Sequence, residues 1–197
     1  MPVEKIIVGR DREDLKEFGE RGTAFLGRHI VGEGEDSHLT SAVQMDVTRP
    51  HIVLICGKTG TGKSIYSSQF LYNGVMSFKE KGLYITTEET KENVIKQMKG
   101  FGWNFDILEE KGWISIQEFE PIEASNLTTK ILNALSSMDT KRVVIDSMSM
   151  FELYISDPFK IRKSILKVIQ KLRDLDTTTL LTTEIPEDSS GLSRFGV

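Results

Sequence analysis

Cysteine is almost absent from this sequence of 197 residues, which contains only Cys56. A single thiol cannot form an internal disulfide, and low cysteine usage is typical of a reducing compartment, so we expect a cytoplasmic location. Long apolar runs are also lacking, since residues 52–56 form one of the longest. A membrane-spanning helix needs about 20 apolar residues, so the sequence predicts no contact with a membrane. The N-terminal residues carry early acids and no long apolar core, which argues against a signal peptide.

An excess of positive charge is missing as well. Asp and Glu number 29 against 25 Lys and Arg, which gives a formal net charge of −4. No global basic field therefore attracts nucleic acid, which stays a possible partner through a local basic surface but is not favoured. The three histidines show no metal-ligand spacing with one another or with Cys56.

Residues 1–50 differ in pattern from the rest of the chain. Short apolar runs alternate there with glycines and charged residues. We expect one or two short strands, a short helix near residues 11–20, and a loop marked by Gly27, Gly32 and Gly34. The sequence thus predicts an N-terminal extension over residues 1–50 and a core domain over residues 51–197.

From residue 51 onward, predicted strands alternate with predicted helices. Five runs are typical of strands, the first of them buried, at residues 51–56, 82–87, 113–117, 142–147 and 177–183. Apolar residues at helical spacing predict a helix in each of the four intervals, with Thr90 as the cap of the second and Pro158 at the start of the last. This alternation predicts a three-layer α/β fold with a mainly parallel sheet.

Residues 57–64 match the complete phosphate-loop pattern G-x-x-x-x-G-K-[ST], the Walker A motif. Glycines let such a loop wrap so that backbone N–H groups point at phosphate oxygens, and the following helix presents its positive end to the same anion. Lys63 supplies a positive charge to the β- and γ-phosphates, and the Ser64 hydroxyl is placed to ligate Mg²⁺. We therefore expect ATP with Mg²⁺, bound by Gly57, Lys58, Thr59, Gly60, Thr61, Gly62, Lys63, Ser64 and Ile65.

Acidic residues follow two of the predicted strands, where the carboxyl ends of parallel strands face the same crevice. Asp146 ends an apolar run and is the expected partner of Mg²⁺, through water. Glu88 and Glu89 either activate the attacking water or form a solvated acidic pair that opens a helix, and the residues alone slightly favour the second reading. Three residues at the end of the fifth strand either sense the γ-phosphate or form a simple turn: Thr182, Thr183 and Glu184.

Over residues 65–197 the sequence resembles the KaiC-like domains of the RecA superfamily of ATPases. The matching stretches are SQFLYNG (68–74), GLYITTEET (82–90), FGWNFDILEEKGWISI (101–116), RVVIDSMS (142–149) and TTLLTTEIPEDSSGLSRFGV (178–197). The resemblance implies a RecA-like fold and nucleotides bound between the subunits of a homo-oligomeric ring, usually a hexamer. It also implies that Glu88 is the base for ATP hydrolysis, with Glu89 and Lys63 as further catalytic residues, and that Lys99 and Gly100 lie close to the adenine.

Residues 1–64 resemble a different family. The stretches at residues 8–34 and 39–64 are similar to HerA-type ATPases, which are hexameric DNA translocases. The two likenesses meet at the phosphate loop, as in a hybrid, and KaiC-like domains continue with further strands and a basic segment beyond the equivalent of residue 197. The chain is then a whole protein, a fragment or a hybrid. We expect slow ATP hydrolysis without the further segment, because a cation from a neighbouring subunit contributes roughly 10³–10⁵-fold in phosphoryl transfer.

Three functions follow as hypotheses. The first is a P-loop ATPase of the KaiC class, in which hydrolysis drives ring assembly or partner switching with an unidentified protein. The second is a nucleotide-dependent signalling or binding module with little turnover. The third and least favoured is a HerA-like DNA translocase.

Overall fold

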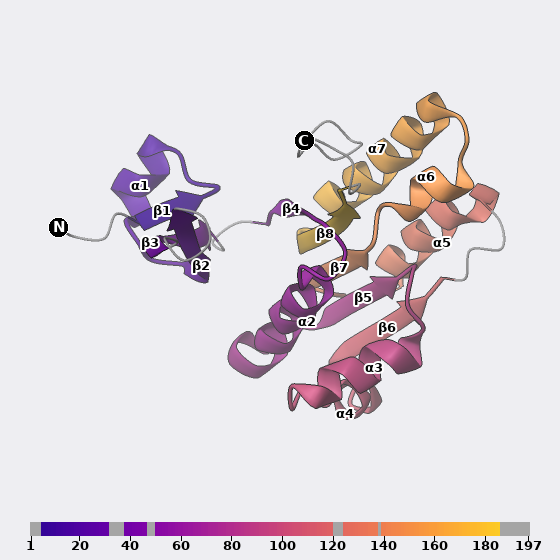
Figure 1. The fold of residues 1–197 in the computed structure, drawn as a ribbon, viewed down its shortest axis with the longest axis horizontal. Coiled ribbons are helices and arrows are strands. Elements are labelled where there is room, and N and C mark those ends of the chain that lie inside the picture. Colours follow the sequence, from indigo (N-terminus) through magenta and orange to yellow (C-terminus); the bar gives the residue numbers. More distant parts are fainter. Residues whose placement is uncertain (1–4, 32–37, 47–49, 120–123, 138, 186–197) are drawn as a thin grey trace. The chain divides into compact units, whose positions relative to one another are not determined.

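The computed structural model describes residues 5–31, 38–46, 50–119, 124–137 and 139–185. Contacts between Cα atoms divide the chain into two compact units, Met1–His51 and Ile52–Val197. Figure 1 labels the helices and strands of each unit.

The described residues of the N-terminal unit form three strands and one helix: β1 (Lys5–Val8), α1 (Arg12–Phe18), β2 (Thr23–Val31) and β3 (His38–Asp46). Its sheet has the order β1-β3-β2, with β1 parallel and β2 antiparallel to β3. The expected helix is confirmed, and the carboxylate of Asp11 caps it by accepting from Glu13 N and Asp14 N.

The expectation of one or two short strands in this unit was wrong. β2 and β3 have nine residues each, and Gly27 lies inside β2 instead of in a loop. The register of the β2–β3 pair shifts between Phe25 and Gly27, which is where glycine suits a strand irregularity. The other two glycines of the predicted loop, Gly32 and Gly34, lie outside the described residues.

The larger unit contains the predicted parallel sheet, with strand order β4-β8-β7-β5-β6, and the four pairings between its described strands are all parallel. Its strands are β4 (Ile52–Gly57), β5 (Gly82–Thr86), β6 (Ile114–Glu118), β7 (Arg142–Asp146) and β8 (Thr178–Glu184). The helices are α2 (Lys63–Asn73) with the π-helix η2 (Gly74–Phe78), α3 (Lys91–Gly100), α4 (Phe105–Glu110), α5 (Ala124–Ser136), α6 (Met150–Tyr154) and α7 (Pro158–Asp174).

Helices cover both faces of this sheet, which confirms the three-layer α/β architecture (Figure 1). One apolar cluster joins α5, α6 and α7 to strand residues such as Leu83 and Ile85. The other joins α2, η2, α3 and α4 to Tyr84 and Val144. Leu83 and Ile85 flank Tyr84 in β5, so the alternation of side chains along the strand feeds both clusters.

Four details of the larger unit differ from the sequence-based expectation. β4 is an edge strand whose Leu54 is 38% exposed, instead of a buried strand. The helix expected over residues 64–80 divides into α2 and η2, and the short helices α4 and α6 were not predicted.

Within the described residues, no helix combines the length and the apolar character that a membrane crossing requires.

Candidate active site

The phosphate loop connects the end of β4 to the start of α2. Gly60 and Gly62 have φ angles of +80° and +83°, a backbone conformation that favours glycine. Gly57 is needed for space, since a Cβ there would lie 2.6 Å from Oγ1 of Thr61. Gly62 directly precedes α2, and no side chain caps the first N–H groups of that helix. The loop therefore has the wrapped shape and the open helix end that suit an anion.

The ammonium group of Lys63 lies over this loop. Its Nζ donates to the carbonyl oxygen of Gly57 at 2.9 Å and to that of Lys58 at 3.0 Å. Both acceptors are neutral, so the charge of the lysine is not neutralised by a carboxylate in direct contact. The positive charge of Lys63 is therefore held beside the backbone of the phosphate loop.

A cavity of about 340 Å³ adjoins the loop and the carboxyl ends of the strands. This volume is in the range typical of small-molecule sites. The residues that line it come from the loop, α2, the ends of β5, β7 and β8, and α3: Thr59, Gly60, Gly62, Lys63, Ser64, Ile65, Thr86, Glu88, Glu89, Gln97, Asp146 and Glu184.

Two buried hydroxyl groups hold the carboxylate of Asp146 at the end of β7. Tyr84 Oη donates to Oδ2 at 2.6 Å, and Thr182 Oγ1 donates to Oδ1. Burial raises the pKa of the Tyr84 phenol well above its usual value, and the negative charge of Asp146 raises it further. The phenol therefore stays protonated and keeps its role as a donor.

The strand ends of β5 and β7 are joined by hydrogen bonds around Thr87. Its N–H donates to Asp146 O at 2.9 Å, and its hydroxyl donates to Ser147 O and accepts from Ser147 N, both at 2.9 Å. Thr87 and Ser147 are 5% and 1% exposed. These bonds fix the backbone that leads to Glu88 beside the backbone that follows Asp146.

The two neighbouring glutamates point to different partners. Ser147 Oγ donates to Glu88 Oε1, so Glu88 is drawn toward the end of β7. Glu89 Oε2 accepts from Asn93 Nδ2 at 3.2 Å, so Glu89 is drawn toward the first turn of α3. Of the two, Glu88 lies nearer to the groups around Asp146.

The environment of Glu88 raises the pKa of its carboxyl group. Burial is the largest cause, and the negative charges of Glu184 and Asp146 act in the same direction. The hydrogen bond from Ser147 and the charge of Lys63 oppose them by lowering the pKa. A carboxylate with a raised pKa is a better proton acceptor when it is ionised.

Glu184 connects the end of β8 to the phosphate loop. Its Oε1 accepts from Thr59 Oγ1 at 2.9 Å, and its N–H donates to Ser149 Oγ at 2.9 Å. Glu184 is also the register partner of Gly57 in the β4–β8 pair. The residue therefore does more than form a turn, because it touches the loop directly.

Most of the predicted site residues come together in this cavity. Gly57, Lys58 and Thr61 shape the loop without lining the cavity, and the other loop residues line it. Gly100, expected near the adenine, does not line it, whereas Gln97 from the preceding turn of α3 does. At the same end of α3, Nζ of Lys99 lies 3.7 Å from Oδ2 of Asp106.

Several contributors were not predicted from the sequence: Gln97, Thr86, Tyr84 and Ser147. The signal available for Tyr84 is its hydroxyl in an otherwise apolar strand, which must find a partner when buried. For Ser147 it is the position directly after Asp146. The sequence pattern alone did not separate either residue from ordinary core and loop positions.

The donor set fits a magnesium ion. Ser64 and Asp146 both line the cavity, and their hydroxyl and carboxylate oxygens are ligands that Mg²⁺ accepts. No group of three or more His, Cys, Asp or Glu residues suited to a metal occurs in the part of the chain that the structure describes.

Comparison with known proteins gives a consistent result. A family model described as "ATPase: KaiC" matches residues 39–197. The circadian clock oscillator protein KaiC of Synechococcus elongatus is 34% identical over 155 residues, which cover 73% of this chain and 30% of that protein. The corresponding protein of Prochlorococcus marinus subsp. pastoris is 30% identical over 154 residues, again 73% of this chain and 30% of that protein. The chain thus spans about 30% of the length of these curated relatives.

A solved structure shows the same likeness. The crystal structure of a KaiC-like protein from the hyperthermophilic archaeon Pyrococcus horikoshii OT3 matches with a TM-score of 0.66 and 36% identity. The match covers 76% of this chain and 66% of that one. The family model also begins at residue 39, upstream of residue 65, where the sequence-based resemblance was expected to begin. The HerA likeness of residues 1–64 stays a prediction.

The hydroxyl of Tyr84 yields the first testable prediction. Replacing Tyr84 with Phe leaves one oxygen of a buried carboxylate without its donor, so we expect the free energy of unfolding to fall by about 1–3 kcal/mol. Urea denaturation measures the change. Tyr72→Phe is the matched control, because the ring of Tyr72 stacks on Trp103 and no described residue bonds its hydroxyl. Equal effects of the two substitutions would contradict a special role for the Tyr84–Asp146 bond.

Proposed function

The chain belongs to the KaiC family of ATPases, and from that premise we propose that its cavity binds ATP with Mg²⁺ and hydrolyses the nucleotide to ADP and phosphate. One observation carries the proposal. The ammonium of Lys63, the Ser64 hydroxyl and the carboxylates of Asp146 and Glu88 line a single cavity, although they come from three separate segments. A triphosphate, its metal ion and an attacking water each have a partner of suitable chemistry in this set.

The loop and Lys63 would bind the phosphates. Backbone N–H groups at the start of α2 point toward an anion, and Lys63 Nζ exchanges its bonds with the Gly57 and Lys58 carbonyls for bonds with phosphate oxygens. That exchange replaces neutral acceptors with charged ones, which strengthens the hydrogen bonds of the ammonium.

Ser64 and Asp146 would hold the metal ion. Ser64 stands at the second position of α2, and Asp146 is fixed by Tyr84 and Thr182. Because both Asp146 oxygens already accept a hydrogen bond, we infer that Asp146 acts mainly on water bound to the ion. When bound, Mg²⁺ neutralises charge on the phosphate oxygens.

Glu88 would accept the proton of the attacking water. Its carboxylate is positioned by Ser147, and the raised pKa makes it a stronger base than an ordinary glutamate. Glu89 has its oxygen bonded to Asn93 and is assigned a supporting part. As water attacks the γ-phosphorus, its proton passes to Glu88 and the bond to ADP breaks.

The charge balance of the cavity suggests why turnover would be slow in an isolated chain. Among the described residues that line it, Lys63 is the one cation, against the carboxylates of Glu88, Glu89, Asp146 and Glu184. A triphosphate adds further negative charge, so a second cation would stabilise the transition state. We propose that a neighbouring subunit of a homo-oligomeric ring supplies it.

The same charge balance supports the second candidate function, a nucleotide-dependent binding module with little turnover. The ATPase hypothesis predicts that assembly into a ring restores hydrolysis. The binding-module hypothesis predicts that turnover stays low after assembly. A DNA translocase remains the third hypothesis. The charges of the cavity beside the phosphate loop neither support nor oppose it.

Replacement of Glu88 with Gln tests the assigned base. The amide cannot accept the proton, so we expect phosphate release to fall by roughly 10²–10⁴-fold while ATP affinity stays nearly constant. Phosphate release and nucleotide binding are measured on the same preparation. Glu89→Gln is the matched control and is expected to have a much smaller effect. Unchanged turnover in Glu88→Gln would remove Glu88 from this role.

The pH dependence of hydrolysis provides a separate test. Glu88 must be ionised to act as a base, and its pKa is raised, so activity should fall on acidification at a higher pH than an ordinary glutamate would give. Ser147→Ala removes a hydrogen bond that lowers this pKa, and the acidic limb should therefore move to still higher pH. A limb that stays in place or moves to lower pH would contradict the assigned interaction.

A further inference from the structure

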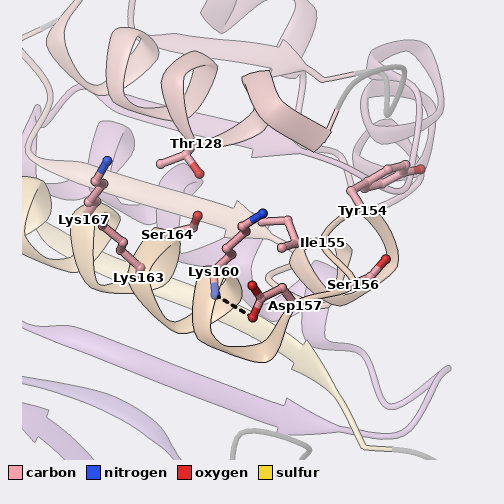
Figure 2. A pocket seen from close by; sticks show the side chains of 9 residues that line it. All are labelled: Thr128, Tyr154, Ile155, Ser156, Asp157, Lys160, Lys163, Ser164 and Lys167. Atoms are coloured by element: carbon pink, nitrogen blue, oxygen red, sulfur yellow. Dashed lines mark hydrogen bonds between the residues drawn. The ribbon is translucent and has the colours of Figure 1, made fainter.

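A second cavity, of about 530 Å³, lies in the other helix layer, between α5 and the first half of α7 (Figure 2). The cavity beside the phosphate loop is called the nucleotide cavity here. None of the residues that line the second cavity also lines the nucleotide cavity. We propose that this second cavity binds a compact anion with at least two phosphoryl groups. The inference goes beyond the proposed function. Its test relies on that function only to fill the phosphate loop with ADP, and the lysine variants of α7 tell the two sites apart.

Three lysines give the second cavity its charge. Lys160, Lys163 and Lys167 line it from positions i, i+3 and i+7 of α7, which span about 10 Å along the helix axis. Among the described residues, none of their ammonium groups forms an ion pair. Like charges at this spacing repel one another, and an anion in the cavity would relieve that repulsion.

The whole of α7 is basic, although the chain as a whole is acidic. The helix has six basic residues and one acidic residue, Asp174, although the whole chain has a net charge of −4. A solvated helix face usually mixes both signs of charge. The accumulation of lysines on the side of α7 that lines a cavity therefore favours recognition of an anion over simple solvation.

Hydroxyl groups supply neutral donors in the same cavity. Thr128 contributes a hydroxyl from α5 and Ser164 one from α7, so hydroxyls come from both helices that border the space, and Tyr154 lines it at the end of α6 (Figure 2). Hydroxyls and ammonium groups together are the donors that bind phosphate oxygens in proteins.

Among the described residues that line the cavity, one is a carboxylate, and it lies at one end. Asp157 Oδ1 accepts from Phe159 N at 2.9 Å and from Lys160 N at 3.4 Å, which makes it the cap of α7 (Figure 2). The lining charges are thus three ammonium groups against one carboxylate. Because Asp157 is engaged as the cap of α7, the three ammonium groups are left for a ligand, and two phosphoryl groups, with about three to four negative charges, offer an acceptor to each of them.

The shape of the site favours a small ligand over nucleic acid. The lysines line a cavity in the size range of small-molecule sites instead of following an extended groove. Asp157 at one end would also repel a phosphate backbone that continued past it. A diphosphate or a small molecule with two phosphate esters fits both conditions.

The test uses inorganic pyrophosphate as the probe, titrated calorimetrically into the full chain saturated with ADP and Mg²⁺, so that the phosphate loop is filled. We expect one further equivalent to bind. Lys163→Ala should weaken this binding about tenfold, and the triple replacement of Lys160, Lys163 and Lys167 with Ala should abolish it. The matched control is Arg162→Ala, on the same helix but outside the cavity, which should leave the affinity unchanged.

Three results would overturn the proposal. The first is the absence of a second equivalent of pyrophosphate. The second is equal weakening by Arg162→Ala and Lys163→Ala, because it would indicate a diffuse basic surface. The third is binding of a 20-base-pair duplex that depends on the three lysines while pyrophosphate does not bind, because it would assign the site to nucleic acid. Circular dichroism of each variant checks that the helices remain folded.

Discussion

The hydrogen bonds that join the ends of β5 and β7 through Thr87 are the constraint on which the active site depends. They involve a buried hydroxyl that both donates to and accepts from the backbone of Ser147. Because the strands are parallel, their carboxyl ends lie at one edge of the sheet, where the phosphate loop also begins. Any shift between the two strands would separate Glu88 from Ser147 and from the charge of Asp146.

The described residues that line the two cavities differ in charge. The nucleotide cavity holds four carboxylates and one ammonium group among the described residues that line it, so it depends on cations brought by the ligand or by a neighbour. The cavity between α5 and α7 has the opposite balance, with three ammonium groups and one carboxylate. The two proposed anion sites would therefore work by different means, one through backbone N–H groups with a metal ion and one through lysine side chains.

Much of the fold was predictable from the sequence because its signals are local. The wrapped loop follows from its glycines, Thr90 caps α3 by accepting from Asn93 N, and Pro158 begins α7. Strand neighbours are not local, so the apolar run of β4 gave no sign that it is an edge strand. The position of Gln97 at the cavity likewise depends on how α3 lies against the sheet, which no short pattern encodes, and the placement of Gly100 near the adenine stays a prediction. Tyr84 and Thr182 were missed as partners of Asp146 because their hydroxyls meet it only across three strands.

The central claim is that the loop and Lys63 form the binding site for a triphosphate. The most direct measurement is a calorimetric titration of the chain and of its Lys63→Ala variant with ATP and Mg²⁺. The account predicts one ATP per chain in the unmodified protein and binding at least about tenfold weaker in the variant, since a hydrogen-bonded charge in contact with phosphate is lost. Equal affinity of the two proteins for ATP would contradict it.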